Sequence, residues 1–131
     1  MTPKEIVLAF WEAMKTNDFA HAAEWLSADF DGHWPQSGEH ILGPAHFAAV
    51  NTAYPANGRW TFELHQIVAE GAEVVTDVSV TDGTLHARAI TFHTVRDGKI
   101  SAQREFWPDP FPAPEWRAQW VSFDGSDPAP D

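Results

Sequence analysis

The residues with the clearest chemistry lie near the C-terminus, where charged and aromatic side chains are interleaved in the segment DGKISAQREFWPDP, residues 97–110. Asp97-Gly98 is typical of a tight hairpin turn, so we expect a strand to follow it. Along that strand Glu105 and Trp107 share one face, because strand side chains alternate between faces. A carboxylate beside an aromatic ring indicates a lined pocket, in which the carboxyl could act as a general acid or base.

Asp109 follows the same strand and lies between Pro108 and Pro110. Apolar walls such as Trp107 would raise the pKa of the aspartate carboxyl and suit it to acid–base work. An aspartate between two prolines is also typical of an exposed turn. Both interpretations stay open on the sequence alone.

Composition and charge narrow the possible partners. The 131 residues contain 19 acidic and 8 basic side chains, for a formal net charge of −11, which disfavours nucleic acid and anionic membranes as partners. There is no cysteine, and therefore no disulfide, thiolate metal site or thiol nucleophile. The N-terminus lacks the pattern of a signal peptide and no apolar run approaches 18 residues, so we expect a cytoplasmic protein.

Motifs for metals and cofactors are missing as well. The seven histidines include no H-x-H or H-x-x-x-H pair, and we predict no metal site. P-loop, G-x-G-x-x-G and G-x-S-x-G motifs are also absent, so we predict no nucleotide or dinucleotide cofactor and no serine hydrolase chemistry.

Three helices are predicted in the first half of the chain. Residues 2–5 (TPKE) form a capping box with proline at the first helical position, and apolar residues recur behind them at helical spacing up to Met14. A second short helix follows Asn17-Asp18, and residues 27–34 look extended. Gly43-Pro44 begins a third helix, which Pro55 ends.

From Arg59 onwards the pattern changes to β-structure. Glycines at 71, 83 and 98 each follow an acidic residue and divide the region into a meander of four strands. Prolines at 108, 110, 112 and 114 then favour an extended chain, and Trp116 and Trp120 predict a short helix that packs back as a lid. We therefore expect one domain over residues 1–110 and a proline-rich extension over 111–131, whose acidic end, residues 124–131, is disordered.

Two-residue turns would fix the register of this meander and with it the two faces of the sheet. They place Asp77 opposite Arg88, and Ile90 opposite Glu105. The face predicted to line a helix-covered pocket then carries Trp60, Phe62, Leu64, Val75, Asp77, Arg88, Ile90, Phe92, Glu105 and Trp107. The opposite face, predicted to be flatter and to receive a dimer partner, carries His65, Ile67, Val74, Thr76, Val78, Ala87, Ala89, Thr91, His93, Ile100, Ala102 and Phe106.

The order of these elements, together with several short motifs, resembles the SnoaL-like, polyketide-cyclase-related proteins of the nuclear-transport-factor-2-like cone superfamily. The motifs are DGKI and REFWPD in the last hairpin, HWP at residues 33–35 and GPxxF at residues 43–47. The resemblance implies an α+β fold, with three N-terminal helices packed on a curved, mostly antiparallel sheet of four to six strands around an internal cavity. It also implies acid–base chemistry by cavity carboxylates, often without a cofactor.

The resemblance also suggests roles for single residues. In SnoaL-like cyclases a key aspartate follows the aromatic residue of the last strand, whereas here Pro108 takes that place and Asp109 comes one residue later. His33 stands where the family often has a polar cavity residue, and an imidazole suits proton transfer near neutral pH. A histidine that only makes hydrogen bonds in a loop is the alternative for His33.

Asp77, Arg88 and Glu105 would form an acid–Arg–acid triad similar to that of the epoxide hydrolases of the family. Arg88 would position or polarise, and a carboxylate would activate water or remove a proton. A structural cross-strand ion pair would explain the same charges, since opposite charges often face each other across strands.

The ligand itself is predicted from the aromatic content of the cavity. We expect Trp34, Tyr54, Phe62, Ile90 and Trp107 to contact a small hydrophobic, ring-containing molecule. Two hypotheses remain: a cofactor-independent enzyme of the cyclase, isomerase, dehydratase or hydrolase type, or a non-catalytic ligand-binding or dimerisation module. In both we expect a homodimer that forms through the outer sheet face.

Overall fold

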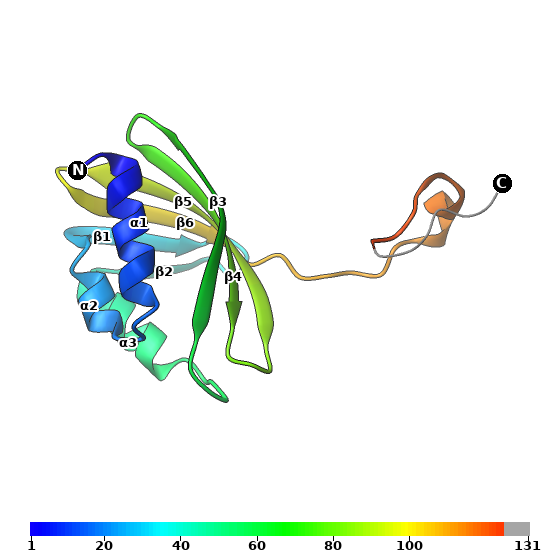
Figure 1. The fold of residues 1–131 in the computed structure, drawn as a ribbon, viewed down its shortest axis with the longest axis horizontal. Coiled ribbons are helices and arrows are strands. Elements are labelled where there is room, and N and C mark those ends of the chain that lie inside the picture. The colour runs from blue at the N-terminus through cyan, green and yellow to red at the C-terminus, as the bar shows by residue number, and fades with distance from the viewer. Residues whose placement is uncertain (125–131) are drawn as a thin grey trace.

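The computed structural model describes residues 1–124 and places three helices on one side of a six-stranded sheet (Figure 1). In chain order the elements are α1 (Pro3–Met14), α2 (Phe19–Ala23), β1 (Leu26–Trp34), β2 (Glu39–Leu42), α3 (Pro44–Ala53), β3 (Thr61–Glu70), β4 (Glu73–Thr81), β5 (His86–Arg96), β6 (Lys99–Phe106) and the 3₁₀ helix η1 (Glu115–Trp120). The predicted α+β cone is confirmed. Of the tail predicted to be disordered, only Asp124 falls within the described residues.

The strand order is β2-β1-β6-β5-β4-β3, because the meander of β3 to β6 ends beside β1. Strands β3 to β6 pair antiparallel in sequence order, as the glycine spacing predicted. Strand β1 then pairs parallel with β6, and β2 folds back antiparallel on β1. The last strand is thereby placed in the middle of the sheet, between β1 and β5.

Helix α1 begins at the predicted capping box. The Thr2 hydroxyl accepts from the Glu5 amide at 3.2 Å, and the Glu5 carboxylate accepts from the Thr2 amide at 2.8 Å. These two bonds satisfy amide groups that the first helical turn leaves unpaired. The helix therefore starts at a defined point and turns one apolar side towards the sheet.

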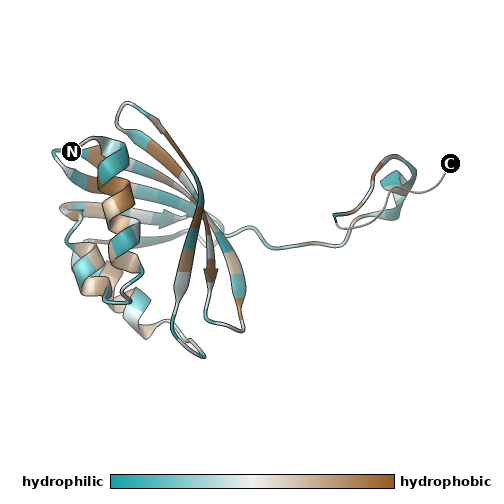
Figure 2. Ribbon diagram, in the orientation of Figure 1, coloured by the Kyte–Doolittle hydropathy of each residue, from teal (hydrophilic) through white to brown (hydrophobic). Residues whose placement is uncertain are grey.

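The core lies between α1 and the sheet face that the helices cover, which we call the inner face. Phe10 and Trp11 of α1 are buried, and the Phe10 ring centroid lies 5.8 Å from that of Phe47 on α3. Figure 2 shows hydrophobic and hydrophilic residues alternating along the strands, as expected for a sheet with one covered face.

Two β-bulges decide which side chains reach the inner face, and they overturn part of the predicted register. One extra residue, His65, interrupts the pairing of β3 with β4, and another, Ser101, interrupts the pairing of β6 with β5. Each bulge reverses the alternation beyond it. The prediction was right for Trp60, Phe62, Leu64, Glu105 and Trp107. It was wrong for most of β4 and β5, and for Ile67 and Ile100, which were expected on the outer face but pack in the core. The buried inner residues of these two strands are Val74, Thr76, Val78, Val80, Ala89, Thr91, His93 and Val95.

The β4–β5 turn also differs from the two-residue turn predicted at Asp82-Gly83. Thr81 pairs with His86, so the loop has four residues. The Asp82 carboxylate accepts hydrogen bonds from the amides of Asn57, Thr84 and Leu85, and these bonds lower its pKa to about 2. This aspartate thus shapes the loop and joins it to the segment before β3.

The C-terminal extension does not pack back as predicted. Trp116 and Trp120 do lie on a short helix, but their exposed fractions are 72% and 70%. In Figure 1 the extension runs away from the body on the side opposite the helices. The lid prediction was therefore wrong, because alternating prolines hold the preceding chain extended and carry the helix away from the cavity.

Within residues 1–124 no helix is long and apolar enough to cross a membrane.

His93 on β5 is the centre of a polar network inside the core. Its ring is fully buried, with Nε2 2.8 Å from the Thr76 hydroxyl and Nδ1 3.1 Å from the Gln103 amide nitrogen. The indole N–H of Trp11 donates to the same threonine hydroxyl at 3.2 Å. Burial lowers the pKa of His93 to about 3, so this ring is neutral at physiological pH.

The free energy of unfolding should therefore fall as the medium is acidified. An unfolded histidine takes up a proton near pH 6.5 and the folded one only near pH 3, so between these values the unfolded chain holds more protons. We expect this difference in proton uptake by His93 to lower the free energy of unfolding by about 2 kcal/mol from pH 7 to pH 5. Urea unfolding at both pH values should show this loss in the wild type and a smaller loss in His93→Gln. The exposed His65→Gln serves as control, and equal pH dependence in all three proteins would contradict the assignment.

Candidate functional site

A cavity of about 630 Å³ lies between the helices and the inner face of the sheet. Its wall is mainly aromatic, with side chains from helices, strands and the connections between them. The aromatic lining residues are Phe10, Trp11, Phe19, Phe30, Trp34, Phe47, Tyr54, Trp60, Phe62 and Trp107. Volume and lining are both typical of small-molecule sites, which measure roughly 300–1,000 Å³.

Glu105 of β6 places a carboxylate on this aromatic wall, and neighbouring strands hold it from both sides. One carboxylate oxygen accepts from the indole N–H of Trp34 on β1 at 3.1 Å. The other accepts from the hydroxyl of Thr91 on β5 at 2.6 Å. Because β6 lies between β1 and β5, these three side chains meet on the inner face.

The surroundings of Glu105 make its carboxyl easier to protonate. Burial among apolar side chains penalises the charged form and raises the pKa of Glu105 above its usual range. Hydrogen bonds from Thr91, Trp34 and Trp107 act in the opposite direction and offset only part of this effect. A carboxyl of this kind can both donate and accept a proton closer to neutral pH than an exposed glutamate can.

Further polar groups reach the cavity from positions that the sequence analysis did not select. Gln103 lines it and also contacts buried His93, so the cavity wall is joined to the network in the core. Asn51 of α3 lines it too and donates to the Phe47 carbonyl at 2.9 Å. The sequence contained a clue for Gln103, which shares the alternation of Glu105, but none for Asn51.

At the rim of the cavity, the side chain of Gln36 holds the end of β6. Its amide nitrogen donates to the Trp107 carbonyl at 3.0 Å, and its amide oxygen accepts from the Trp107 backbone N–H. Asp109 lies just beyond, lines the cavity and is exposed. The two Gln36 bonds fix Trp107 where the cavity meets solvent.

Tyr54 directly follows α3. Its ring packs edge-on against the ring of Trp60, with 6.0 Å between the ring centroids.

Several residues predicted for the site do line this cavity. They are His33, Trp34, Tyr54, Phe62, Glu105, Trp107 and Asp109. Asp77 and Arg88 do not, because the bulges turn them to the sheet face opposite the helices, which we call the outer face. There they form an ion pair, with 2.9 Å between Arg88 Nη2 and Asp77 Oδ2, and the guanidinium lowers the pKa of the aspartate. Ile90 is absent from the lining as well. The predicted triad is therefore split, since Glu105 lies on the other face.

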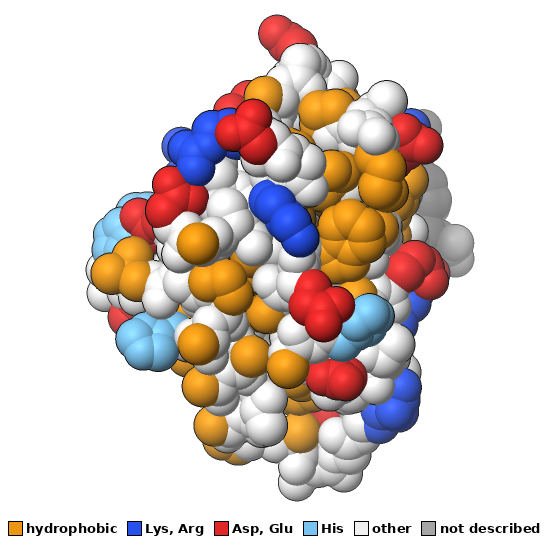
Figure 3. Space-filling view, turned by 90° about the vertical axis from the view of Figure 1, so that its left-hand side faces the viewer, with side chains coloured by type: hydrophobic (Ala, Val, Ile, Leu, Met, Phe, Trp, Pro, Cys, Tyr) orange, Lys and Arg blue, Asp and Glu red, His pale blue; other side chains and the backbone are white. Residues whose placement is uncertain are grey.

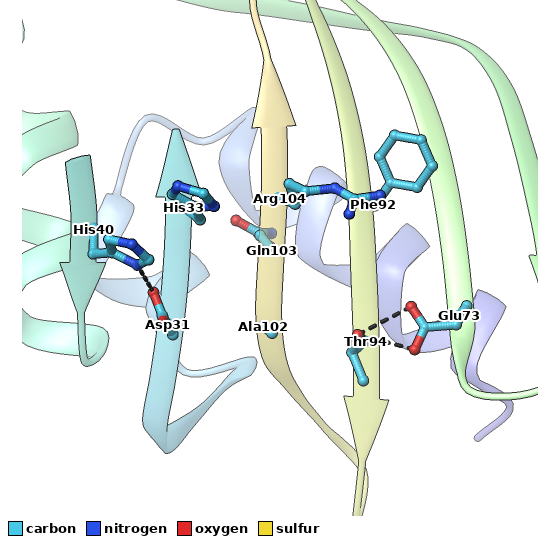
Figure 4. Close-up of a pocket in the computed structure, with 9 residues that line it drawn as sticks. All are labelled: Asp31, His33, His40, Glu73, Phe92, Thr94, Ala102, Gln103 and Arg104. Atoms are coloured by element: carbon cyan, nitrogen blue, oxygen red, sulfur yellow. Dashed lines mark hydrogen bonds and ion pairs between the residues drawn. The ribbon is translucent and has the colours of Figure 1, made fainter. Parts of the chain in front are cut away.

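His33 was predicted to assist from the cavity wall; the residue is part of the lining of that cavity, but its ring lies on the outer face. It stacks on His40 with 4.2 Å between ring centroids, and His40 Nδ1 lies 2.8 Å from the Asp31 carboxylate. Figure 4 shows these side chains with Arg104 and Phe92 around a shallow outer pocket of about 280 Å³. The cause is alternation along β1, in which Trp34 points inward and its neighbour outward.

The charges around the cavity have one sign. Its lining, within residues 1–124, contains the carboxylates of Glu39, Glu105 and Asp109 but no lysine or arginine. In Figure 3, which shows the left-hand side of the view in Figure 1, hydrophobic side chains gather beside acidic, basic and histidine side chains. The formal net charge of −11 adds to this negative potential. Also within the described residues, no group of three metal-ligating side chains comes together.

Family comparison agrees with this architecture. The model of the SnoaL-like domain matches residues 7–103, from α1 to the middle of β6. The chain belongs to the SnoaL-like family. No curated protein is significantly similar to this SnoaL-like chain.

Solved structures extend the likeness beyond the matched domain. A nuclear-transport-factor-2-like protein of unknown function from Burkholderia xenovorans is 32% identical, with a TM-score of 0.77 over 94% of this chain and 95% of its own. A protein from Kribbella flavida assigned as a ketosteroid isomerase is 24% identical, with a TM-score of 0.86 over 95% and 91%. An LEH-like epoxide hydrolase from M. tuberculosis is 23% identical, with a TM-score of 0.66 over 81% and 82%.

These comparisons establish the fold. Solved structures of this fold include proteins assigned as a ketosteroid isomerase, a SnoaL-like polyketide cyclase and an epoxide hydrolase. The acid–Arg–acid triad predicted for an epoxide hydrolase does not assemble in this SnoaL-like chain, because Asp77 and Arg88 lie on the outer face. The cavity of this member therefore has to be judged from its own residues.

Replacing Glu105 by glutamine should stabilise this SnoaL-like protein above neutral pH. The ionised carboxyl is disfavoured by burial, so the folded state binds its proton more tightly than the unfolded state and loses stability as pH rises. The glutamine side chain keeps an oxygen that accepts from the Trp34 indole N–H, and its amide N–H can donate to the Thr91 hydroxyl oxygen. In urea unfolding, the free energy of unfolding of Glu105→Gln should exceed that of the wild type at pH 8 and lie closer to it at pH 5. A less stable variant at pH 8 would contradict this.

Proposed function

We propose that this protein binds a small, apolar, ring-containing molecule in the inner cavity and that Glu105 transfers a proton to or from it. The observation that carries the proposal is a carboxyl held by Trp34 and Thr91 on an aromatic wall, with a raised pKa. General acid–base catalysis needs such a group within reach of the bound molecule. The reaction would be a cofactor-independent isomerisation, cyclisation, dehydration or hydrolysis.

The ligand should carry no negative charge. Carboxylates line the cavity while lysine and arginine are missing from the described lining, so an anionic group would meet repulsion without a partner. Aromatic rings, which favour apolar rings and also cations, dominate the wall. A neutral ring system with hydroxyl or carbonyl groups fits this lining, and Gln103, Asn51 and Tyr54 would supply its hydrogen bonds.

The charge preference can be measured before any natural ligand is found. N-phenyl-1-naphthylamine and 1-anilinonaphthalene-8-sulfonate share one ring system, but only the second carries a sulfonate. We expect the neutral probe to bind at least tenfold more tightly, because only the sulfonate is repelled. Energy transfer from the cavity tryptophans to either probe gives the affinity, with Trp34→Leu as control for binding in the cavity. Equal or stronger binding of the sulfonate would contradict the proposal.

Catalysis by Glu105 is tested by pairing a compound screen with substitutions. Neutral ring compounds that displace N-phenyl-1-naphthylamine are incubated with the protein and followed by mass spectrometry and chiral chromatography. Glu105→Gln should bind such a compound but convert it at least 100-fold more slowly, the scale expected when a general acid or base is lost. Glu73→Gln changes a carboxylate that bonds Thr94 on the outer face and should keep full activity. Full turnover by the Glu105 variant would refute the catalytic role.

A non-catalytic binding module is the second candidate, favoured by one specific observation. Both Glu105 oxygens already have donors in the protein, namely Trp34 and Thr91, so the carboxylate is fully explained as a structural group that joins β6 to β1 and β5. Displacing compounds that bind to the wild type but are never converted would favour this candidate.

Two further proposals concern the assembly of the protein and its location. A homodimer through the outer face fits the half-exposed Phe92 and the Arg104 guanidinium 4.7 Å from its ring centroid, since aromatic and arginine side chains are enriched in interfaces. Asp109 as a second acid or base and a cytoplasmic location stay predictions. The partner we propose is a small molecule, with neither nucleic acid nor membrane involved.

A further inference from the structure

The C-terminal extension exposes large aromatic side chains to solvent. The exposed fractions of Phe111, Trp116 and Trp120 are 76%, 72% and 70%. Within residues 108–122 no hydrogen bond or ion pair joins the extension to the body. We call residues 108–122 the arm. Large apolar side chains gathered on an exposed segment mark an interaction surface.

The arm is built to be held away from its own body. The Gln36 side chain holds the Trp107 backbone, which fixes the point of departure. Prolines at 108, 110, 112 and 114 then favour the polyproline II conformation, which Pro114 adopts with φ −69° and ψ 143°. At about 3.1 Å per residue this segment spans on the order of 25 Å before η1 begins. Such a spacer keeps η1 from folding back over the cavity of the same chain.

The direction of the arm points to its partner. In Figure 1 it continues past the end of β6 and runs away from the helices. The outer face carries its own exposed apolar groups, including Val68 and Phe92. A second subunit that covers the outer face would lie beside the arm of the first, and by two-fold symmetry each arm would reach the other subunit.

The likeness to the matched Burkholderia structure extends beyond the body of the domain. Residues 1–110 are 110 of 131, or about 84% of the chain, whereas that structure superposes on 94% of it. The superposed part must therefore continue into the arm.

We propose that the arm is exchanged between subunits: in a homodimer that covers the outer face, Phe111, Trp116 and Trp120 of each chain pack on the other chain. Each aromatic side chain can bury about 150–250 Å². Two exchanged arms would thus contribute on the order of 900–1,500 Å², close to the 1,200–2,000 Å² of a stable interface. The outer face adds to this area.

Photo-cross-linking of the full-length chain tests the exchange directly. Benzoylphenylalanine is placed at Gln119, on η1 between the two tryptophans, and the purified protein is irradiated at micromolar concentration. We expect a covalent product of twice the monomer mass, with peptides that join the arm to the other chain. Mixing with isotope-labelled protein identifies links between chains. Links found only within one chain, or only monomer in light scattering, would overturn the proposal.

A second measurement tests the contribution of the aromatic side chains. The double substitution Trp116→Ser and Trp120→Ser should weaken dimerisation on the order of 100-fold, because tryptophans at interface centres are common hot spots. Unfolding measured at a concentration where both proteins are monomeric should be unchanged, since both side chains are exposed in the single chain. Gln119→Ser is the matched control and should dimerise like the wild type. Unchanged dimerisation of the double variant in sedimentation velocity would overturn the proposal.

Discussion

Each side chain of this sheet points either to the inner face or to the outer face, and the rest of the structure depends on which of the two it occupies. One face is sealed by helices and the other is open, so a reversal of alternation moves a residue from core to surface. The bulges at His65 and Ser101 impose two such reversals. They bring Thr91 and His93 inward and turn the Asp77–Arg88 pair outward. Core, cavity and outer face all follow from these two extra residues.

The inner face shows how polar groups are tolerated in an apolar interior. His93, Thr76 and Gln103 satisfy one another, and His93 stays neutral, so little free energy is lost by their burial. Glu105 is different, because its acidic group keeps donors from Trp34 and Thr91 and still has a raised pKa. A side chain that costs stability when ionised, on the wall of a cavity, is typical of a functional site.

The outer face and the arm belong to a different level of organisation. The arm leaves the body at the Gln36–Trp107 contact, next to the rim of the cavity. An exchanged arm would therefore tie the subunit interface to the end of β6, the strand that carries Glu105. Assembly and the geometry of the cavity would then share one structural element, although the proton transfer itself would need no second subunit.

The sequence alone determined the local structure. The capping box at Thr2, the third helix from Pro44 and the hairpin at Asp97 are specified by residues close in the chain, and these features were predicted correctly. Alternation along one strand also placed Glu105 and Trp107 together on the inner face. Motifs of the last hairpin identified the family, which the SnoaL-like match confirmed.

Only the tertiary structure decided which strands share a face and what surrounds each charge. A bulge has no reliable sequence pattern, and each one shifts the pairing of a whole strand, so the Asp77–Arg88–Glu105 triad could not survive it. The parallel pairing of β1 with β6 brings Trp34 to Glu105 across 71 residues of chain. The raised pKa of Glu105 and the lowered pKa of His93 both arise from burial. Burial is a property of the packed fold and not of any segment of the sequence.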